Sequence, residues 1–366
     1  MKQNLMLGAC LLSLSLGYST DAKSTEFNPQ LNGIVLFELE NDWAYDSEDS
    51  DAEVNTLFTT IEPYLLLSLT DRLAIESNLV LEPLKSSKAK GDDRFLEDHT
   101  LSIEELKLSY FGDNYTVFAG KYNPTFGIAW DLAKGIVGKD LAKTYELKER
   151  IGLGGSYTVG SKKIGTHTAT ASFFFLDTTF LSESLFKERT DSELSKGGVS
   201  NTEDLSSHSF TLDSENVAGI KGLDTHIGYY NQAEGDADSS SKVNEKGYAA
   251  AVTYQFYADD HHKIKMKALL EYADLHNFKG TKDKDEQFIT GSLVTKYDKK
   301  WNLTIAHTQQ TITEPSVSTK DDYQFQISAG RVFKNGISLD VGYRQAEKSD
   351  KKTEGIISLL GYTYEF

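Results

Sequence analysis

The sequence has almost no cysteine and little proline: 1 Cys and 5 Pro among 366 residues. A single cysteine excludes a disulfide framework and a cysteine-rich metal site. Long hydrophobic runs are missing too, because no stretch reaches the roughly 18 consecutive apolar residues of a transmembrane helix. The net charge of −17 argues against the basic surface that binding to nucleic acid requires, so no nucleic-acid partner is expected.

Aromatic side chains are abundant instead, with 19 Phe, 19 Tyr and 3 Trp. Hydrophobic residues make up 39% and charged residues 25% of the chain, a balance typical of a folded protein rather than a disordered one. Many aromatic residues together with scarce proline favour β-strands over a loop-rich fold.

The first 22 residues predict an export signal. Lys2 supplies a positive charge, residues 5–16 form a short apolar run, and the small residues Thr20 and Ala22 offer a cleavage site. The run is too short to span a bilayer, which distinguishes a signal peptide from a membrane anchor. We therefore expect residues 23–366 to form a single exported domain without cysteine.

After Lys23, hydrophobic residues recur with a period of two, which is the period of a β-strand. The end of the chain illustrates this, because Ile356, Leu360 and Phe366 share one face while Gly361 and Glu365 share the other. The pattern predicts an all-β protein of sixteen antiparallel strands. We expect them at residues 31–42, 54–69, 73–84, 99–111, 115–122, 148–159, 164–176, 206–214, 222–232, 246–257, 263–276, 286–297, 301–311, 321–333, 337–346 and 355–366.

The predicted connections alternate between short turns and long polar loops. An even strand number with this alternation is typical of a transmembrane β-barrel of the bacterial outer membrane, with apolar side chains toward lipid and polar ones toward the lumen. The period alone does not exclude a soluble exported β-protein, and fourteen or eighteen strands remain alternatives. The long loops are expected at residues 43–53, 85–98, 123–147, 177–205, 233–245, 277–285, 312–320 and 347–354.

Two of the predicted strands contain irregularities that indicate β-bulges. Pro63 lies inside the second strand, where its missing N–H interrupts the hydrogen-bond ladder. In the fourth strand the apolar positions change parity between Ile103 and Leu106, as they do where one extra residue is inserted.

The chain ends in alternating aromatic residues, Tyr362, Tyr364 and Phe366. This ending resembles the C-terminal assembly signal of bacterial outer-membrane proteins, and the resemblance implies recognition by the barrel assembly machinery. A barrel also requires its last strand to pair with its first, which removes the open edges of the sheet. The alternative is an ordinary edge strand that ends in Phe.

Two stretches carry a resemblance to a known family: residues 120–131 (GKYNPTFGIAWD) and residues 145–152 (YELKERIG). They resemble a segment of Gram-negative outer-membrane porins of the sixteen-strand trimeric kind, some of which are grouped with phosphate-selective porins. The resemblance implies a homotrimer surrounded by outer-membrane lipid and lipopolysaccharide. It also implies that the third long loop, residues 123–147, folds into the barrel and narrows it.

The composition of this loop agrees with that implication, because it is too apolar for a solvated extracellular loop. Its charged residues would then line a constriction and set a charge preference. The alternative is a loop folded over the barrel mouth, with a short amphipathic helix at residues 131–147. The candidate constriction residues are Asp131, Lys134, Lys139, Asp140, Lys143 and Glu146.

Three cations of the predicted strands, Lys265, Lys267 and Arg344, should face the lumen. Opposite the acidic groups of the third loop, they would create a field across the pore. The alternative is scattered lumen charge, which barrels tolerate and which tunes selectivity without defining a site.

The sequence therefore predicts a passive diffusion channel for small hydrophilic solutes and ions, without catalytic residues, metal or cofactor. One alternative is a channel selective for anions such as phosphate. Another is an outer-membrane enzyme, although none of the eight His lies in a recognisable catalytic motif. The cluster at 259–262 (DDHH) falls on a predicted turn and lacks further ligands at a metal-site spacing.

Overall fold

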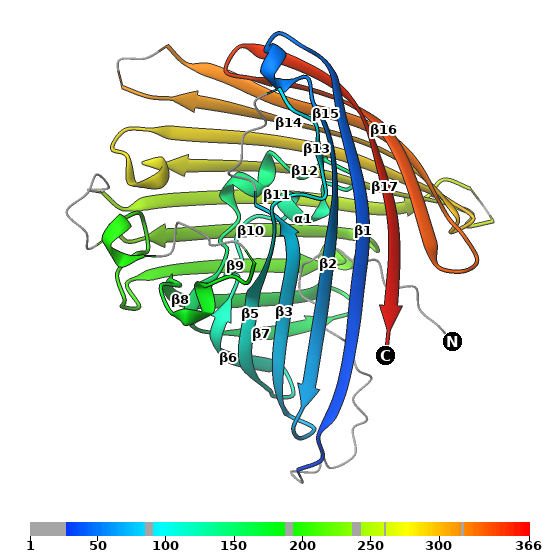
Figure 1. Ribbon diagram of the computed structural model, residues 1–366. Coiled ribbons are helices and arrows are strands. Elements are labelled where there is room, and N and C mark those ends of the chain that lie inside the picture. The colour runs from blue at the N-terminus through cyan, green and yellow to red at the C-terminus, as the bar shows by residue number, and fades with distance from the viewer. Residues whose placement is uncertain (1–26, 85–90, 187–192, 236–242, 260, 316–317) are drawn as a thin grey trace.

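The computed structural model describes residues 27–84, 91–186, 193–235, 243–259, 261–315 and 318–366, and the predicted signal peptide lies outside these ranges. Sixteen strands form one closed antiparallel barrel (Figure 1). The barrel closes where β1 (Gln30–Ser47) pairs with β17 (Lys351–Glu365). None of the described helices is long and apolar enough to cross a membrane.

The other strands follow one another around the barrel, each hydrogen-bonded to its neighbours in the sequence. They are β2 (Asn55–Ser68), β3 (Leu73–Pro83), β5 (His99–Phe111), β6 (Tyr115–Tyr122), β7 (Arg150–Ser161), β8 (Gly165–Leu176), β9 (Ser207–Glu215), β10 (Leu223–Gln232), β11 (Glu245–Tyr257), β12 (Ile264–His276), β13 (Asp285–Tyr297), β14 (Trp301–Thr313), β15 (Lys320–Val332) and β16 (Ile337–Lys348). The prediction of sixteen strands is confirmed.

In the part of the chain that the structure describes, helical structure is limited to single turns in the connections. The α-helix α1 (Ala129–Leu132) and the 3-10 turn η2 (Ala142–Tyr145) both lie between β6 and β7. The other 3-10 turns in the described chain are η1 (Ser50–Ala52), η3 (Phe180–Ser182), η4 (Leu194–Lys196), η5 (Val217–Gly219) and η6 (Phe278–Gly280).

Apolar side chains face outward and polar ones face inward, which is the reverse of a soluble sandwich. In β12, Leu270 is 55% exposed while the next residue, Glu271, is 1% exposed. The two faces of β1 differ in the same way, with Phe37 and Leu39 outside and Glu38 and Glu40 inside. This arrangement is favourable only where hydrocarbon surrounds the outer face.

The wall between β2 and β5 is irregular at the predicted places. The β1–β2 ladder is continuous, whereas the β2–β3 ladder skips Glu62 and Pro63. In β5, Glu104 is an extra residue, because Asn78 pairs with Glu105 while Leu79 pairs with Ile103. The bulge expected in the fourth predicted strand is confirmed. At Pro63 the ladder is interrupted as expected, but the register is the same on both sides, so no residue is inserted there.

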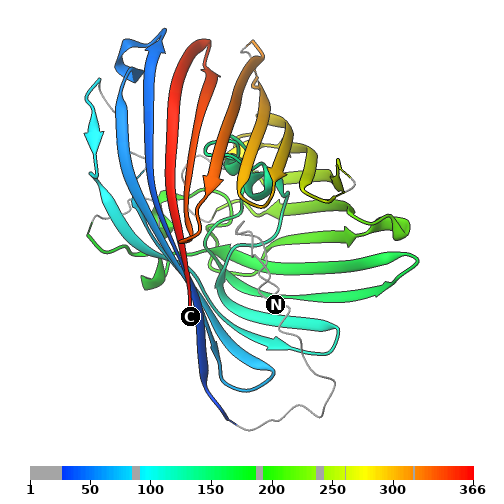
Figure 2. The same cartoon turned by 90° about the vertical axis from the view of Figure 1, so that its right-hand side faces the viewer.

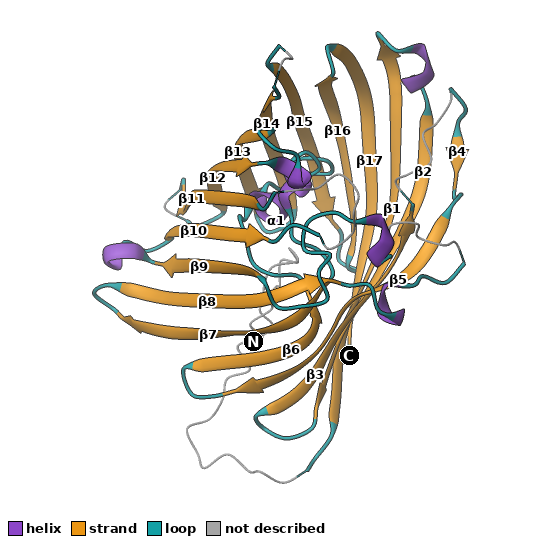
Figure 3. Ribbon diagram, turned by 90° about the vertical axis from the view of Figure 1, so that its left-hand side faces the viewer, coloured by secondary structure: helices purple, strands orange, loops and turns teal. Residues whose placement is uncertain are grey.

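Two loop segments fill the gaps that remain in this wall. The two-residue strand β4 (Arg94–Phe95) pairs in parallel with the start of β2, above the level where β3 ends (Figure 3). Beyond the last pair with β6, Leu101 of β5 hydrogen-bonds in both directions with Leu185. Neither segment was predicted as a strand.

The prediction of a long loop at residues 347–354 is wrong. β16 and β17 continue until Lys348 pairs with Lys351, and only Ser349 and Asp350 form the turn. Both turn residues have positive φ, 54° and 61°, as a type I′ hairpin requires. The strands extend where both faces meet water, so the hydrogen bonds continue although the apolar alternation has ended.

Candidate pore constriction

The connection between β6 and β7, residues 123–149, contains several fully buried residues. Phe126, Ala129, Ala133 and Ala142 have no exposed surface. Figure 2 shows the helical turns of this connection on the concave side of the sheet. We call residues 123–149 the inner segment.

Inward-facing polar side chains of the wall hold the inner segment by hydrogen bonds, and Glu271 and Gln326 make several of these bonds. The carboxylate of Glu271, on β12, accepts hydrogen bonds from the backbone N–H groups of Ile128 (2.5 Å) and Ala129 (3.0 Å), and from the Tyr145 hydroxyl (2.5 Å). Gln326, on β15, accepts from the N–H of Val137 at 2.9 Å and donates to the carbonyl of Lys134 at 3.2 Å. Each anchor therefore satisfies backbone groups of the segment that would otherwise be buried unpaired.

Apolar residues of the wall face the segment where a lumen would ordinarily be polar. Ala251, Leu269, Leu275 and other inner-face residues of β11, β12 and β13 pack with the segment in one buried cluster. Edge-to-face aromatic pairs connect the segment to the wall. The ring centroids of Phe126 and Tyr230 are 4.4 Å apart, and those of Tyr145 and Phe288 are 5.0 Å apart. This apolar footprint explains the hydrophobic character of the loop.

Gly135 allows a close approach of the segment to the wall. Its φ is +116°, and a Cβ there would lie 1.3 Å from the Gln326 amide nitrogen. Only glycine adopts this backbone and leaves that space.

The six charged residues predicted for the constriction lie in different surroundings. Asp131 is 2% exposed and lies 3.5 Å from the Lys134 ammonium, whereas Asp140 is exposed. Lys139 and Lys143 are half-buried, and both interact electrostatically with Glu38 of β1. Glu146 is half-buried.

Two of the predicted constriction residues, Lys139 and Glu146, have shifted pKa values. Burial works against the charged form of Lys139, but Glu38 and Glu62 outweigh it and raise the pKa of Lys139. Burial raises the pKa of Glu146, against the opposing effect of the Lys148 ammonium at 3.3 Å. At neutral pH Lys139 therefore remains a cation.

The three predicted wall cations all lie on the inner face. Lys265 and Lys267 share the face of Glu271 on β12, and Arg344 of β16 donates to Asp42 of β1 at 2.8 Å. The structure does not bring them up to acidic groups of the segment. It is instead the lysines of the segment that approach the carboxylates of β1.

Sequence reasoning missed the acidic row Glu38, Glu40 and Asp42, although the signal was present. The three acids occur at every second residue of β1, so they fall on one face. It also missed the anchors Glu271 and Gln326, whose role depends on contacts more than 120 residues away in the chain. No local pattern indicates such contacts.

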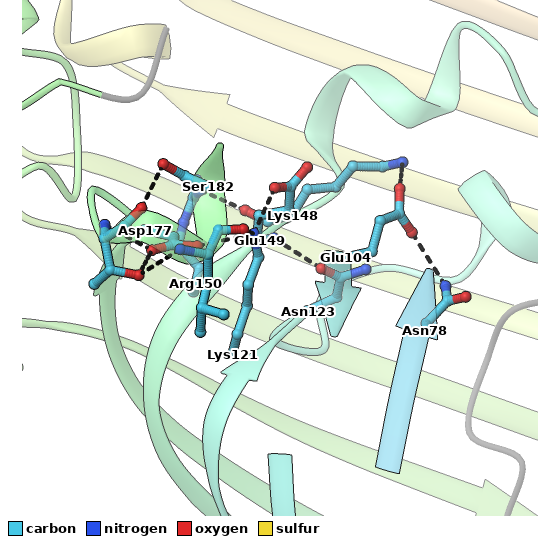
Figure 4. A network of polar contacts seen from close by, with 11 residues as sticks. Asn78, Glu104, Lys121, Asn123, Lys148, Glu149, Arg150, Asp177 and Ser182 are labelled. Atoms are coloured by element: carbon cyan, nitrogen blue, oxygen red, sulfur yellow. Dashed lines mark hydrogen bonds and ion pairs between the residues drawn. The ribbon is translucent and has the colours of Figure 1, made fainter. Parts of the chain in front are cut away.

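An ion network fastens both ends of the inner segment to the wall and to the next loop (Figure 4). The ammonium of Lys121, which is fully buried, lies 2.9 Å from Glu149 and 2.8 Å from Asp177, and donates to the carbonyl of Leu181 at 2.8 Å. Lys148 lies 3.3 Å from Glu104, the extra residue of β5. The bulge and the segment are therefore linked directly.

The described residues contain little that suggests catalysis. The Nδ1 atom of His226 lies 2.7 Å from Asp213, but His226 is 2% exposed and packed near Phe126. Within the described ranges, no group of three or more His, Cys, Asp or Glu side chains could hold a metal ion. Asp259 accepts from the backbone N–H groups of Lys263 and Ile264, as the turn interpretation of 259–262 predicts.

Comparison with known proteins rests on structure. No protein-family profile matches the sequence, and no curated protein matches it either. OmpF of Salmonella typhi, in complex with daunomycin, superimposes with a TM-score of 0.60 at 11% identity, over 92% of this chain and 98% of that one. An anion-selective porin of Comamonas acidovorans gives a TM-score of 0.54 at 9% identity, over 93% and 100% of the chains.

A third similar structure is the trimer form of OmpT, an outer membrane protein of Vibrio cholerae, with a TM-score of 0.52 at 10% identity over 92% and 99% of the chains. The chain has the fold of the sixteen-stranded outer-membrane porins. At these identities the likeness establishes the fold alone.

Proposed function

We propose that the protein is an outer-membrane porin, a water-filled channel through which small hydrophilic solutes and ions diffuse passively. The observation that carries the proposal is the inside-out pattern of the closed barrel, in which Leu270 faces outward and Glu271 inward along the same strand. A sixteen-stranded barrel is too wide for its own wall side chains to fill. The remaining lumen is a path for water and solutes.

The inner segment is proposed to be the constriction. Thr211 of β9, Glu271 of β12 and Gln326 of β15 hold it by hydrogen bonds, and Ile357 of β17 packs against it. The open path then runs along the wall from β1 to β5. There the lysines of the segment face the acidic row of β1. Solute size and charge would be selected between these two surfaces.

Export through the predicted signal peptide at residues 1–22 and assembly through Tyr362, Tyr364 and Phe366 belong to the same proposal. The aromatic ends of the last strand are exposed on the outer face. A homotrimer is proposed on the likeness to the trimeric OmpT, with lipid and lipopolysaccharide around it. A channel selective for anions is the second candidate, because a porin of the same fold is described as anion-selective.

The test is planar-bilayer conductance of purified residues 23–366, with the reversal potential under a KCl gradient. Stable stepwise conductance is expected, in groups of three for a trimer. The sign of the reversal potential distinguishes a cation-preferring pore from an anion-preferring one. Absence of conductance from a folded and inserted barrel would overturn the proposal and direct attention to a plugged or enzymatic barrel.

A further inference from the structure

Two lysines lie directly opposite each other on the inner wall. Lys265 of β12 pairs with Lys296 of β13 in the ladder register, and both point to the lumen, as does Lys267 two residues along β12. Like charges directly opposite on one face of a sheet destabilise the pair. The opposed lysines therefore lower the stability of this part of the wall.

No carboxylate neutralises the three lysines by contact. Across the described ranges, the chain holds no ion pair within 4.0 Å for Lys265, Lys267 or Lys296, although it holds many others. Asp340 of β16 acts on Lys296 from a distance, and Asn302 holds its carboxylate at 2.9 Å. Lys134 of the inner segment adds another positive charge that acts on Lys296.

We propose that Lys265, Lys267 and Lys296 form a binding site for a small oxyanion on the lumen wall. The site rests on the proposed function, because lumen water must bring the anion to it. An ammonium group binds phosphate-type oxygens as a compact point charge. An anion with several charged oxygens would contact two or three ammonium groups at once and relieve the repulsion between the opposed pair, which chloride does less well.

The position of the cluster assigns it to one mouth of the pore. Lys265 and Lys296 lie next to the short connections at residues 258–263 and 298–300, so the site is at the end of the barrel with the short turns. The acidic row of β1 lies on a different part of the wall. The lumen therefore offers an anion a local binding site rather than a continuous basic path.

The probe is inorganic phosphate, added to either side of a bilayer that contains the channel in about 0.1 M KCl, where the Debye length is about 10 Å. Phosphate should reduce the current more than added KCl of equal ionic strength, and more strongly from one side. In the double variant K265Q/K296Q the phosphate concentration for half-reduction should rise at least tenfold. The matched control K334Q removes an exposed lysine from a short turn at the same end and should respond like the wild type.

A second measurement does not require conductance. In detergent, phosphate should raise the denaturant midpoint of the wild-type protein but not that of K265Q/K296Q. Without phosphate, K296Q alone should have a higher midpoint than the wild type, because it removes the repulsion. Equal phosphate responses of wild type and double variant in both assays would overturn the site while the channel stands, whereas a wild type that does not conduct overturns the channel.

Discussion

The wall from β1 to β5 and the wall from β11 to β14 have opposite inner surfaces. The first carries carboxylates such as Glu38, Glu40 and Glu62, and its ladders are broken at Pro63 and Glu104. The second carries small and apolar side chains where the inner segment lies, with Lys265, Lys267 and Lys296 near its short turns, and its ladders run without a break. The same barrel therefore has an open polar side and a covered apolar side.

The difference shows what apolar residues on a lumen face mean. Ala249, Leu269 and Phe288 face inward because the inner segment covers them, so they mark the footprint of a loop. The irregular side has no such cover, and its broken ladders are completed by β4 and Leu185 from loops. The continuous hydrogen-bond ladders of β11 to β14 lie under the inner segment. The interrupted ladders of β2, β3 and β5 lie where β4 and Leu185 add to the wall.

The largest expected effect concerns the joint between the irregular wall and its loops. Lys121→Met leaves Glu149 and Asp177 without their buried counter-ion, which should cost about 3–5 kcal/mol. The denaturant midpoint should fall, and residues 177–186 and 193–206 should become sensitive to protease in the folded protein. An exposed-site control, Lys334→Met, should change neither, and an unchanged midpoint for K121M would contradict the role of the triad.

The next effect tests the covered side. Glu271→Ala removes three hydrogen bonds from the inner segment, a loss of about 3 kcal/mol or more at roughly 1–3 kcal/mol for each buried unpaired group. The segment should detach, and single-channel conductance should increase. Glu271→Gln keeps one acceptor oxygen, so its single-channel conductance should lie between those of the wild type and Glu271→Ala.

Glu286→Ala is the matched control for that experiment. Glu286 is also a buried inner-face carboxylate, on β13, but it accepts from Gln310 at 2.7 Å rather than from the segment. Its loss should lower stability and leave conductance unchanged. If both variants gave the same conductance as the wild type, Glu271 would not be an anchor of the constriction.

A smaller effect is expected where the two sides meet, at Glu146. Because burial raises its pKa above the unfolded value, the folded state binds this proton more tightly, and stability from this group increases as the pH falls through the raised pKa. Acidification from neutral pH should therefore tighten the packing of the segment and lower the conductance. The part of the pH response that is missing in Glu146→Gln is due to Glu146. If the wild type and Glu146→Gln had the same pH dependence of conductance, Glu146 would have no such role.

The smallest effect is on the β16–β17 hairpin. Asp350 has φ of 61° in a two-residue turn, where glycine is unstrained. Asp350→Gly should therefore stabilise the protein by about 0.5 kcal/mol, measured as a rise in the denaturant midpoint without a change in conductance. The same substitution at Asp340, outside any turn, should give no such gain.

Much of the barrel could be predicted from the sequence, because the period of two is a local property. The strands at 99–111 and 115–122 have the predicted bounds, and the irregularities at Pro63 and Glu104 were visible as a residue type and a parity change. The extended β16–β17 hairpin could not be predicted. Both faces of its strands meet water near the turn, so apolar and polar residues do not alternate there.

The candidate site was only partly predictable, for a related reason. Periodicity assigned Lys265 and Lys267 to the lumen, but it could not pair Lys265 with Lys296, since ladder register depends on both strands and their turn. In the same way, the hydrophobicity of the inner segment indicated that it packs, whereas its partners Glu271 and Gln326 follow only from the closed fold.

The seam between β1 and β17 has a consequence for how the protein is made. The last backbone N–H and C=O, of Phe366, pair with Gly33 near the beginning of the chain. A nascent or truncated chain therefore has two unpaired edges, each able to pair with other chains, and closure depends on contacts that span nearly the whole sequence, which form slowly. Until the last strand has been made and has paired with β1, the unpaired edges have to be kept from self-association by other factors.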